Sequence, residues 1–215
     1  ESPVGGYLDD GEPGLARTIA SVPQTVLVNP PNTKTRYSNV GPSIAGRMVE
    51  LASGMSYEHY QRECVLGPLG MTSSAWLRRM VPRGRLVDSW LRVADGRGGF
   101  VRQRCPVFDL GTVAAGNLYT TAEDLARFLA MLSAGGRGPG GRVLESETLA
   151  QMFTPQLTGG ETGFGLGFAI GEIQGFKVVG HNGAVYGHSA SLAFLPEPKL
   201  GVVVLANEDL VNARV

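Results

Sequence analysis

The spacing of hydrophobic residues changes about three quarters of the way along the chain. Up to residue 155, apolar residues recur mainly every three or four positions, as in amphipathic helices. From residue 156 onward, short apolar runs alternate with turn residues, which is typical of strands. The sequence therefore predicts an α/β (α+β) chain with a mostly helical region, 1–155, and an antiparallel sheet portion, 156–215.

The first half of the helical region predicts three helices. A short helix is expected near residues 15–20, and a longer one should follow Asn39 and end at Gly54, a typical C′ residue. A third helix should begin after Ser56, which can cap it, and stop before Gly67. The apolar residues of the longer helix share one face: Ile44, Met48, Val49, Leu51 and Ala52.

The strongest helix signal in the chain begins at Thr120. Thr120 and Glu123 have the spacing of a capping box, and a glycine-rich stretch, 133–141, ends the helix. Apolar residues follow at i, i+3, i+4 and i+7: Leu125, Phe128, Leu129 and Leu132. A shorter helix is expected over 146–153. The preceding segment, 82–117, is rich in arginine and glycine and predicts irregular chain with short strands near 90–93 and 100–101.

The last part of the chain predicts four short strands. Residues 196–199 form a turn, and the apolar runs on either side of it have the right length to pair as an antiparallel hairpin. The strands are expected at 164–171, 176–180, 189–195 and 200–206.

Composition excludes several classes of protein. The 19 Lys and Arg residues balance the 19 Asp and Glu residues, so no net positive charge attracts nucleic acid. The longest apolar run, 200–206, has the length of a strand, so no membrane span is predicted.

Cys64 and Cys105 could form at most one disulfide, and their spacing leaves open whether they pair. The chain begins with Glu1 rather than Met, so we expect that a segment precedes it in the gene product.

Single candidate motifs give weak signals. Residues 187–191 lack only the last glycine of the Gly-x-Ser-x-Gly elbow, but that elbow lies between a strand and a helix, whereas strand residues follow Ser189. An α/β-hydrolase that uses Ser189 is therefore the weaker alternative. No acidic residue lies at zinc-ligand spacing from His181 or His188, so no metal site is predicted.

Two short motifs far apart in the chain give a stronger signal. Tyr37, Ser38 and Asn39 form a Tyr-x-Asn motif at a helix start, and residues 181–183 form His-x-Gly ahead of a hairpin. Together with their surroundings, they resemble the serine beta-lactamase and penicillin-binding-protein superfamily, in particular its class C-like branch of esterases, D-aminopeptidases and D-alanyl-D-alanine carboxypeptidases. Four further segments carry the resemblance: 68–71, 115–125, 163–168 and 202–207.

The resemblance implies a fold, a reaction and a set of site residues. The fold is a three-layer sandwich in which helices flank an antiparallel sheet, and the reaction passes through an acyl-enzyme on an ester or amide, without a metal or organic cofactor. Tyr37 and His181 would be catalytic, and their side chains should lie within about 10 Å of each other. A phenol relays the nucleophile's proton once cationic neighbours lower its pKa. The implied substrate-binding residues are Asn39, Asn182, Gly183 and Ala184, the last through its N–H as an oxyanion donor.

The chain departs from the superfamily in its nucleophile and at one site residue. The superfamily's Ser-x-x-Lys is absent, since the residues three before Lys34, Lys177 and Lys199 are not serine. With a histidine where beta-lactamases usually carry lysine, His181 favours an esterase or peptidase over a beta-lactamase, because histidine is largely neutral at pH 7.

The departures lead us to expect a fragment or subunit of a serine hydrolase. The superfamily's N-terminal strands, nucleophile helix and C-terminal helix are expected to lie outside this chain, either in cis or in a second chain, or to be replaced by self-association. A non-catalytic peptide- or peptidoglycan-binding relative is the alternative. The compartment stays open, although the superfamily is often exported to the bacterial periplasm or envelope, or secreted. The sheet left uncovered should expose apolar residues: Phe168, Phe176, Val178, Leu192, Phe194, Val202 and Val204.

Overall fold

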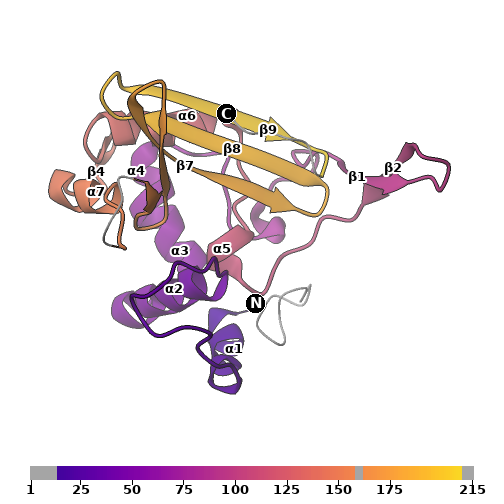
Figure 1. Cartoon of the computed structure of the whole chain (residues 1–215), viewed down its shortest axis with the longest axis horizontal. Coiled ribbons are helices and arrows are strands. Elements are labelled where there is room, and N and C mark those ends of the chain that lie inside the picture. The colour runs from indigo at the N-terminus through magenta and orange to yellow at the C-terminus, as the bar shows by residue number, and fades with distance from the viewer. Residues whose placement is uncertain (1–13, 158–161, 210–215) are drawn as a thin grey trace.

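The computed structural model describes residues 14–157 and 162–209. Helices dominate the chain before residue 155, and a five-stranded sheet follows. Figure 1 shows α1 to α3 grouped below the sheet and a two-stranded hairpin, β1–β2, that projects from the body. The helices are α1 (Leu15–Ala20), η1 (Val22–Gln24), α2 (Val40–Ser53), α3 (Tyr57–Gln61), η2 (Arg62–Leu66), α4 (Gly67–Leu69), η3 (Arg78–Met80), α5 (Val113–Gly116), α6 (Ala122–Ser133) and α7 (Ser146–Met152). This arrangement confirms the predicted mixture of helices and antiparallel strands.

The main sheet is an antiparallel meander in the order β5-β6-β7-β8-β9. The predicted hairpin across 196–199 is confirmed, since Leu195 pairs with Leu200. The predicted strand 164–171 is instead two short strands, β5 and β6, because the chain turns back between Phe164 and Ala169, which pair with each other. The strands are β5 (Gly163–Phe164), β6 (Ala169–Ile173), β7 (Phe176–Val185), β8 (His188–Leu195) and β9 (Leu200–Ala206). Strand β7 is therefore longer than the predicted 176–180.

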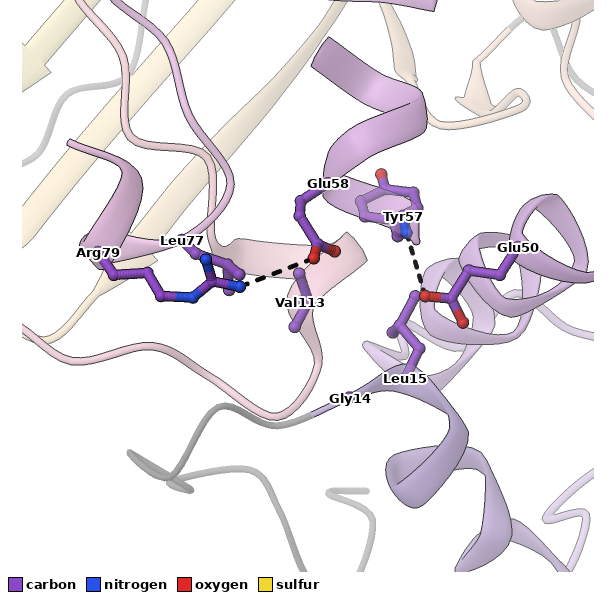
Figure 2. Close-up of a pocket in the computed structure, with 8 residues that line it drawn as sticks. All are labelled: Gly14, Leu15, Glu50, Tyr57, Glu58, Leu77, Arg79 and Val113. Carbon is purple, nitrogen blue, oxygen red and sulfur yellow. Dashed lines mark hydrogen bonds and ion pairs between the residues drawn. The ribbon is translucent and has the colours of Figure 1, made fainter. Parts of the chain in front are cut away.

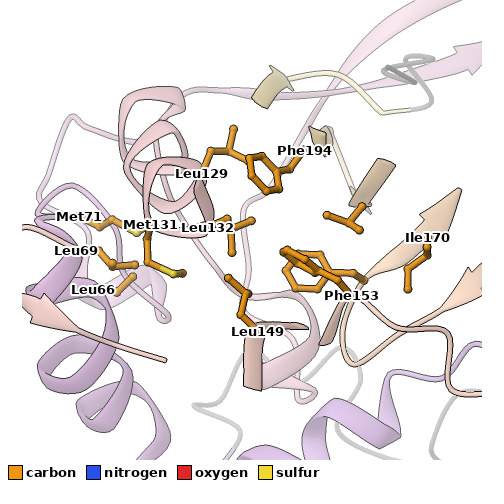
Figure 3. Close-up of a cluster of buried hydrophobic side chains, with 12 residues drawn as sticks. Leu66, Leu69, Met71, Leu129, Met131, Leu132, Leu149, Phe153, Ile170 and Phe194 are labelled. Atoms are coloured by element: carbon orange, nitrogen blue, oxygen red, sulfur yellow. The ribbon is translucent and has the colours of Figure 1, made fainter. Parts of the chain in front are cut away.

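One face of the sheet packs against α6 and α7 to form the main core. Val179, Phe194 and Ile170 alternate inward from neighbouring strands and are almost completely buried. Leu129 of α6 lies so close to β9 that a Cβ on Gly201 would come within 2.8 Å of it. Figure 3 shows this cluster of twelve side chains: Leu66, Leu69, Met71, Leu129, Met131, Leu132, Leu149, Phe153, Phe168, Ile170, Val179 and Phe194.

The opposite face of the sheet is less well covered. Phe176 and Val204 point to this face and are 46% and 38% exposed. The expectation that Phe168 and Phe194 would also be uncovered is wrong, because both side chains are buried in the core against the helices. Leu205 is 40% exposed on the face that packs against helices, so exposed apolar side chains occur on both faces of the sheet.

Helix α2 buries its small residues instead of its apolar stripe. Ser43 is fully buried, and a Cβ on Gly46 would lie only 2.9 Å from Leu15 Cδ1 of α1. Met48 and Leu51, on the predicted apolar face, are 64% and 69% exposed. The neighbouring helices approach so closely that only small residues fit between them, so the large apolar residues of α2 face outward.

The next helix is longer than its sequence predicts. It continues through the π-type turn η2 and α4 and ends at Gly70, which has a φ of 70°. Pro68 has no N–H to donate, and the wider π-type hydrogen-bond register just before it lets the helix pass this position. Gly67 is therefore inside the helix, and the predicted stop before it is wrong.

Helix α6 begins one residue later than predicted. Thr121, rather than Thr120, is its N-cap, and the Thr121 hydroxyl accepts a hydrogen bond from the N–H of Asp124 at 3.2 Å. The hydroxyl of Thr120 instead lies 2.7 Å from that of Ser74. The predicted apolar face of α6 is confirmed, because its residues pack into or against the core.

The irregular segment 82–117 contains the two strands that its sequence predicts. They are β1 (Ser89–Ala94) and β2 (Phe100–Cys105), which pair with each other as an antiparallel hairpin. Two very short strands, β3 (Arg137–Gly138) and β4 (Gly141–Arg142), form a second, minimal hairpin after α6.

The two cysteines do not form a disulfide. Cys64 on η2 is partly buried and Cys105 at the end of β2 is buried, and both are free thiols. Burial raises the pKa of the Cys105 thiol, which keeps it protonated at neutral pH.

A buried carboxylate fixes the start of α6. Asp124 is 1% exposed and accepts hydrogen bonds from the Ser73 N–H at 2.8 Å and the Ser74 hydroxyl at 2.7 Å. We expect Asp124→Ala to lower the free energy of unfolding by about 3 kcal/mol, because it removes the buried carboxylate that accepts the hydrogen bonds from Ser73 and Ser74. Urea denaturation measures the effect, with Glu123→Ala, an exposed neighbour, as the matched control. A loss below about 1 kcal/mol for Asp124→Ala would contradict this role.

Candidate active site

The fold brings together the two residues predicted to be catalytic. The ring centroids of Tyr37 and His181 lie 6.1 Å apart, although 144 positions separate them in the sequence. Tyr37 is 62% exposed and His181 is also exposed, so both rings are open to solvent. The prediction that they lie within about 10 Å of each other is confirmed, whereas their catalytic roles stay predictions.

The start of α2 holds the Tyr37 segment in place. The hydroxyl of Ser38 accepts a hydrogen bond from the N–H of Val40 at 3.1 Å and so caps the helix. Asn39 is the N-cap residue by position, but its side chain makes no capping hydrogen bond. Its carbonyl oxygen accepts a hydrogen bond from the buried Ser43 hydroxyl at 2.8 Å. Capping therefore falls to Ser38 and leaves the Asn39 carboxamide for another role.

A short hydrogen bond fixes the ring of His181. Its Nδ1 lies 2.6 Å from the carbonyl oxygen of Asn182. A carbonyl oxygen only accepts hydrogen bonds, so Nδ1 carries the proton and donates it. In the neutral ring, Nε2 then has a free lone pair. By strand alternation His181 shares a sheet face with Val179, the face that packs against helices.

Strand β7 has an edge without a partner beside His181. Pairing between β6 and β7 ends at Gly180, opposite Ala169, whereas pairing between β7 and β8 continues to Val185. Within 14–157 and 162–209, no strand pairs with the other edge of residues 181–185. This edge can therefore accept an extended substrate or peptide.

The register shows which backbone groups point toward this edge. The loop between β6 and β7 has two residues, Gln174 and Gly175, with φ of 52° and 82°, so the pair that flanks it is hydrogen-bonded. Hydrogen-bonded and non-hydrogen-bonded pairs alternate, so even-numbered residues of β7 direct their N–H groups to the β6 side. The N–H groups of Asn182 and Ala184 therefore point to the unpaired edge, as an oxyanion donor at Ala184 requires.

The side chains of the His-x-Gly segment point to both faces of the sheet. Asn182 lies on the face opposite His181, where its carboxamide oxygen accepts a hydrogen bond from the buried Ser191 hydroxyl at 2.8 Å. Gly183 shares the face of His181, and a Cβ there would contact only Ala190 Cβ, at 3.5 Å. The structure thus brings Gly183 to the side of Tyr37 but holds the Asn182 side chain away from it.

Two aromatic residues near the end of β7 were missed by the sequence reasoning. The rings of Phe108 and Tyr186 lie 5.8 Å apart, which links the 106–111 loop to the turn after β7. That loop is fixed by Asn117, whose carboxamide accepts from the Leu110 N–H at 2.8 Å and donates to the Leu110 carbonyl at 3.2 Å. Asn117 belongs to the segment 115–125, which resembles the superfamily. The sequence therefore pointed to this segment, but it assigned no role to Asn117.

The Ser189 alternative is contradicted by the structure. Ser189 lies within β8, directly after a two-residue turn and before further strand, so it occupies no strand-to-helix elbow. Its side chain is buried, and its hydroxyl donates a hydrogen bond to the carbonyl of Glu208 at 2.9 Å. Burial also lowers the pKa of the neighbouring His188, so that ring is neutral at pH 7.

A small pocket in the helical region contains none of the predicted site residues. It has a volume of about 140 Å³ and is shown in Figure 2. Inside it, the Glu50 carboxylate accepts a hydrogen bond from the Tyr57 N–H at 3.1 Å, and Glu58 lies 3.9 Å from Arg79. Burial raises the pKa of Tyr57, so its phenol stays protonated. The lining residues are Gly14, Leu15, Glu50, Tyr57, Glu58, Leu77, Arg79 and Val113.

The fold and the facing motifs define a class, the serine beta-lactamase and penicillin-binding-protein superfamily. The chain matches the beta-lactamase family model over residues 3–214, and it belongs to that family. It is 30% identical over 207 residues to penicillin-binding protein 4 of Amycolatopsis lactamdurans, and the matched region covers 92% of this chain and 53% of that protein. It is also 30% identical over 188 residues to putative beta-lactamase-like 1 of Homo sapiens, and the matched region covers 84% of this chain and 35% of that protein. The chain thus spans about half or less of these relatives.

Solved structures agree with the family assignment. The octameric penicillin-binding protein homologue from Pyrococcus abyssi has a TM-score of 0.77 at 27% identity, covering 96% of this chain and 49% of that one. A D-amino acid amidase from Ochrobactrum anthropi SV3 has a TM-score of 0.77 at 20% identity, covering 96% of this chain and 61% of that one. At this identity the amidase shows a shared fold alone. The predicted beta-lactamase-like fold is therefore confirmed.

Two glycines of β7 offer a test of the open edge. We expect Gly183→Ala to change the free energy of unfolding by less than about 0.5 kcal/mol, because a Cβ there meets only an ordinary contact. Gly180→Ala should cost about 2 kcal/mol, because its Cβ would lie 2.2 Å from the carbonyl oxygen of Leu192. Urea denaturation of both variants measures the difference. Equal losses would show that Gly183 is kept for packing rather than for access to the edge.

Proposed function

We propose that the chain forms part of a serine hydrolase that acts through an acyl-enzyme on an ester or amide. The observation that carries this proposal is the approach of Tyr37 to His181, at 6.1 Å, beside the unpaired edge of β7. Family membership supports the reaction class, because the chain matches the beta-lactamase family model and is 30% identical to a penicillin-binding protein. An esterase or a D-amino-acid peptidase or carboxypeptidase fits better than a beta-lactamase.

Tyr37 acts as the proton relay in this proposal. In the phenolate form its oxygen takes the proton of the nucleophilic hydroxyl as that hydroxyl attacks the carbonyl, and the resulting phenol gives the proton to the leaving alcohol or amine. His181 helps to hold the substrate, because its fixed ring presents Nε2 as an acceptor when neutral and as a donor when charged. A largely neutral histidine holds a carboxylate less firmly than lysine does, which favours ester and amide substrates over beta-lactams.

The edge of β7 orients the substrate carbonyl. The N–H of Ala184 serves as one oxyanion donor, because the strand register directs it to the unpaired edge. The absence of a side chain at Gly183 lets the substrate lie close to the backbone. The carboxamide of Asn39 forms hydrogen bonds with the substrate or with a catalytic lysine. The role of Asn182 comes from its backbone, since its side chain is bonded to Ser191 on the other face.

The nucleophile comes from outside this chain. None of the three lysines follows a serine by three positions, and the chain spans 53% and 49% of two matched proteins. The outward apolar face of α2 supports a missing neighbour, because Met48 and Leu51 are 64% and 69% exposed. A segment in cis, a second chain or a second copy of this chain would cover that face.

A non-catalytic peptide-binding relative is the second candidate. The observation that favours it is the unpaired edge of 181–185, which can bind an extended peptide by strand addition without any nucleophile. Such a protein would keep Gly183 and the backbone N–H groups of the edge but would need no proton relay at Tyr37. Covalent chemistry therefore separates the two candidates.

Labelling with a fluorophosphonate probe tests the proposed reaction. We expect no labelling of the isolated chain, and labelling of a Ser-x-x-Lys serine when the chain is produced with its complete coding sequence. In that complete protein, Tyr37→Phe should lower the labelling rate at least about 100-fold, because it removes the proton relay. Tyr60→Phe, on α3, is the matched control and should leave the rate unchanged.

Peptide mapping of the labelled site decides the outcome. Labelling at Ser189, or at any other serine of this chain, would contradict the assignment of the nucleophile to another segment. A complete protein that contains no Ser-x-x-Lys and takes no label would favour the peptide-binding candidate.

Exposed apolar faces predict how the isolated chain behaves in solution. Burial of apolar area contributes about 25 cal/mol per Å² to the free energy of folding, so leaving several hundred Å² uncovered loses on the order of 10 kcal/mol. We therefore expect the purified chain to self-associate or to be unstable unless its partner segment is present. Sedimentation velocity measures this. Met48→Ser with Leu51→Ser should reduce the association, whereas a stable, well-folded wild-type monomer would contradict the proposal.

A further inference from the structure

The β1–β2 hairpin and the segment leading into it concentrate positive charge. Residues 83–104 carry six arginines and two aspartates in a chain whose net charge is +0. Arg92 and Arg102 pair with Glu208, so counting this carboxylate leaves an excess of three positive charges. The hairpin projects away from the body, as Figure 1 shows, so these charges are presented on a convex surface.

The same region exposes large apolar side chains. Phe100, at the start of β2, is 64% exposed, and Val87, before β1, is 59% exposed. Leu86, Val93 and Val101 are exposed as well. Because Val93 pairs with Val101 and Phe100 with Ala94, the apolar residues of the hairpin gather at its outer end. An exposed apolar tip on a projecting element marks an interaction surface.

Cations and rings lie against each other on one face of the hairpin. The Arg92 guanidinium lies 5.0 Å from the centre of the Phe100 ring, and the Arg102 guanidinium lies 5.0 Å from that of Trp90. Arg92 and Arg102 are directly opposite each other across the strands, and Glu208 bridges them at 3.4 and 3.1 Å. The arginines and aromatic rings are thus continuous on this face, whereas Val93 and Val101 lie on the other face of the hairpin.

The base of the hairpin is attached to the sheet. The N–H of Trp90 donates to the carbonyl of Gly187 at 3.4 Å, and the N–H of Asp209 donates to the carbonyl of Trp90 at 2.9 Å. Gly187 lies in the turn between β7 and β8, has a φ of 78° and would place a Cβ 2.6 Å from Ser89, so only glycine fits this contact. A partner bound by the hairpin would therefore be held at a fixed place relative to the end of β7.

We propose that this hairpin docks the protein on an anionic lipid bilayer. Phe100, Val101 and Val93 enter the headgroup region, and the surrounding arginines pair with lipid phosphates. A projecting, convex tip fits a flat and deformable surface, whereas it cannot enclose a peptide. A soluble polyanion would use the arginines but would gain nothing from the exposed apolar tip. No helix within the described ranges is long and apolar enough to cross a bilayer.

Vesicle co-sedimentation tests this docking. We expect the protein produced with its complete coding sequence to bind vesicles of equal parts phosphatidylglycerol and phosphatidylcholine, and to bind pure phosphatidylcholine at least about ten-fold more weakly. Arg85→Gln with Arg97→Gln should weaken binding about 25-fold, since each arginine near an anionic surface contributes about five-fold. Phe100→Ser with Val101→Ser should weaken binding by a similar factor. Arg62→Gln with Arg137→Gln, at exposed positions on η2 and β3 rather than on the hairpin, is the matched control and should leave binding unchanged.

Three outcomes would overturn the proposal. The first is equal binding to the two kinds of vesicle, and the second is no binding to either. The third is binding to soluble polyphosphate as tight as to vesicles, with no effect of Phe100→Ser and Val101→Ser, which would identify a soluble polyanion as the partner. Circular dichroism of each variant confirms that the substitutions, all at exposed positions, leave the fold intact.

Discussion

The site depends on where β6 begins, at Ala169. Strand β6 stops pairing opposite Gly180, whereas β7 continues for five more residues to Val185, so β7 has one open edge. The chain before β6 cannot extend along that edge, because the N–H of Leu166 is bonded to the carbonyl of Met152 at 3.1 Å, which ties the chain to α7. Backbone groups that would otherwise complete the sheet are thereby directed outward beside His181.

The helical region must approach this edge closely enough to use it. Ser43 and Gly46 make this possible, because their small side chains let α1 and α5 pack directly against α2. The segment just before α2 then meets the sheet at one point, where the Tyr37 ring lies 6.1 Å from that of His181. Small residues on one helix and the late start of β6 therefore create the site together, although neither contributes a reactive group.

The sequence predicted the elements better than their contacts. Turn chemistry and periodicity are local, so the 196–199 hairpin and the apolar face of α6 follow directly from the residues. The resemblance was enough to predict the approach of Tyr37 to His181. The buried face of α2 could not be predicted, because it depends on how closely two other helices approach. The opposite directions of Asn182 and Gly183 follow only once the extent of β7 is known.

The exposed apolar surfaces of the molecule are of two kinds, and their charge distinguishes them. Met48 and Leu51 on α2 belong to a face with little charge of its own, since the Arg47 side chain is paired with Glu50 at 2.8 Å. A surface of that kind gains most from another protein surface that excludes water. The hairpin combines exposed apolar residues with an excess of arginine. A protein partner that covered them tightly would have to remove water from these charges, at a high cost in free energy. A bilayer interface avoids that cost, because it accepts apolar groups while phosphates and water solvate the guanidinium groups.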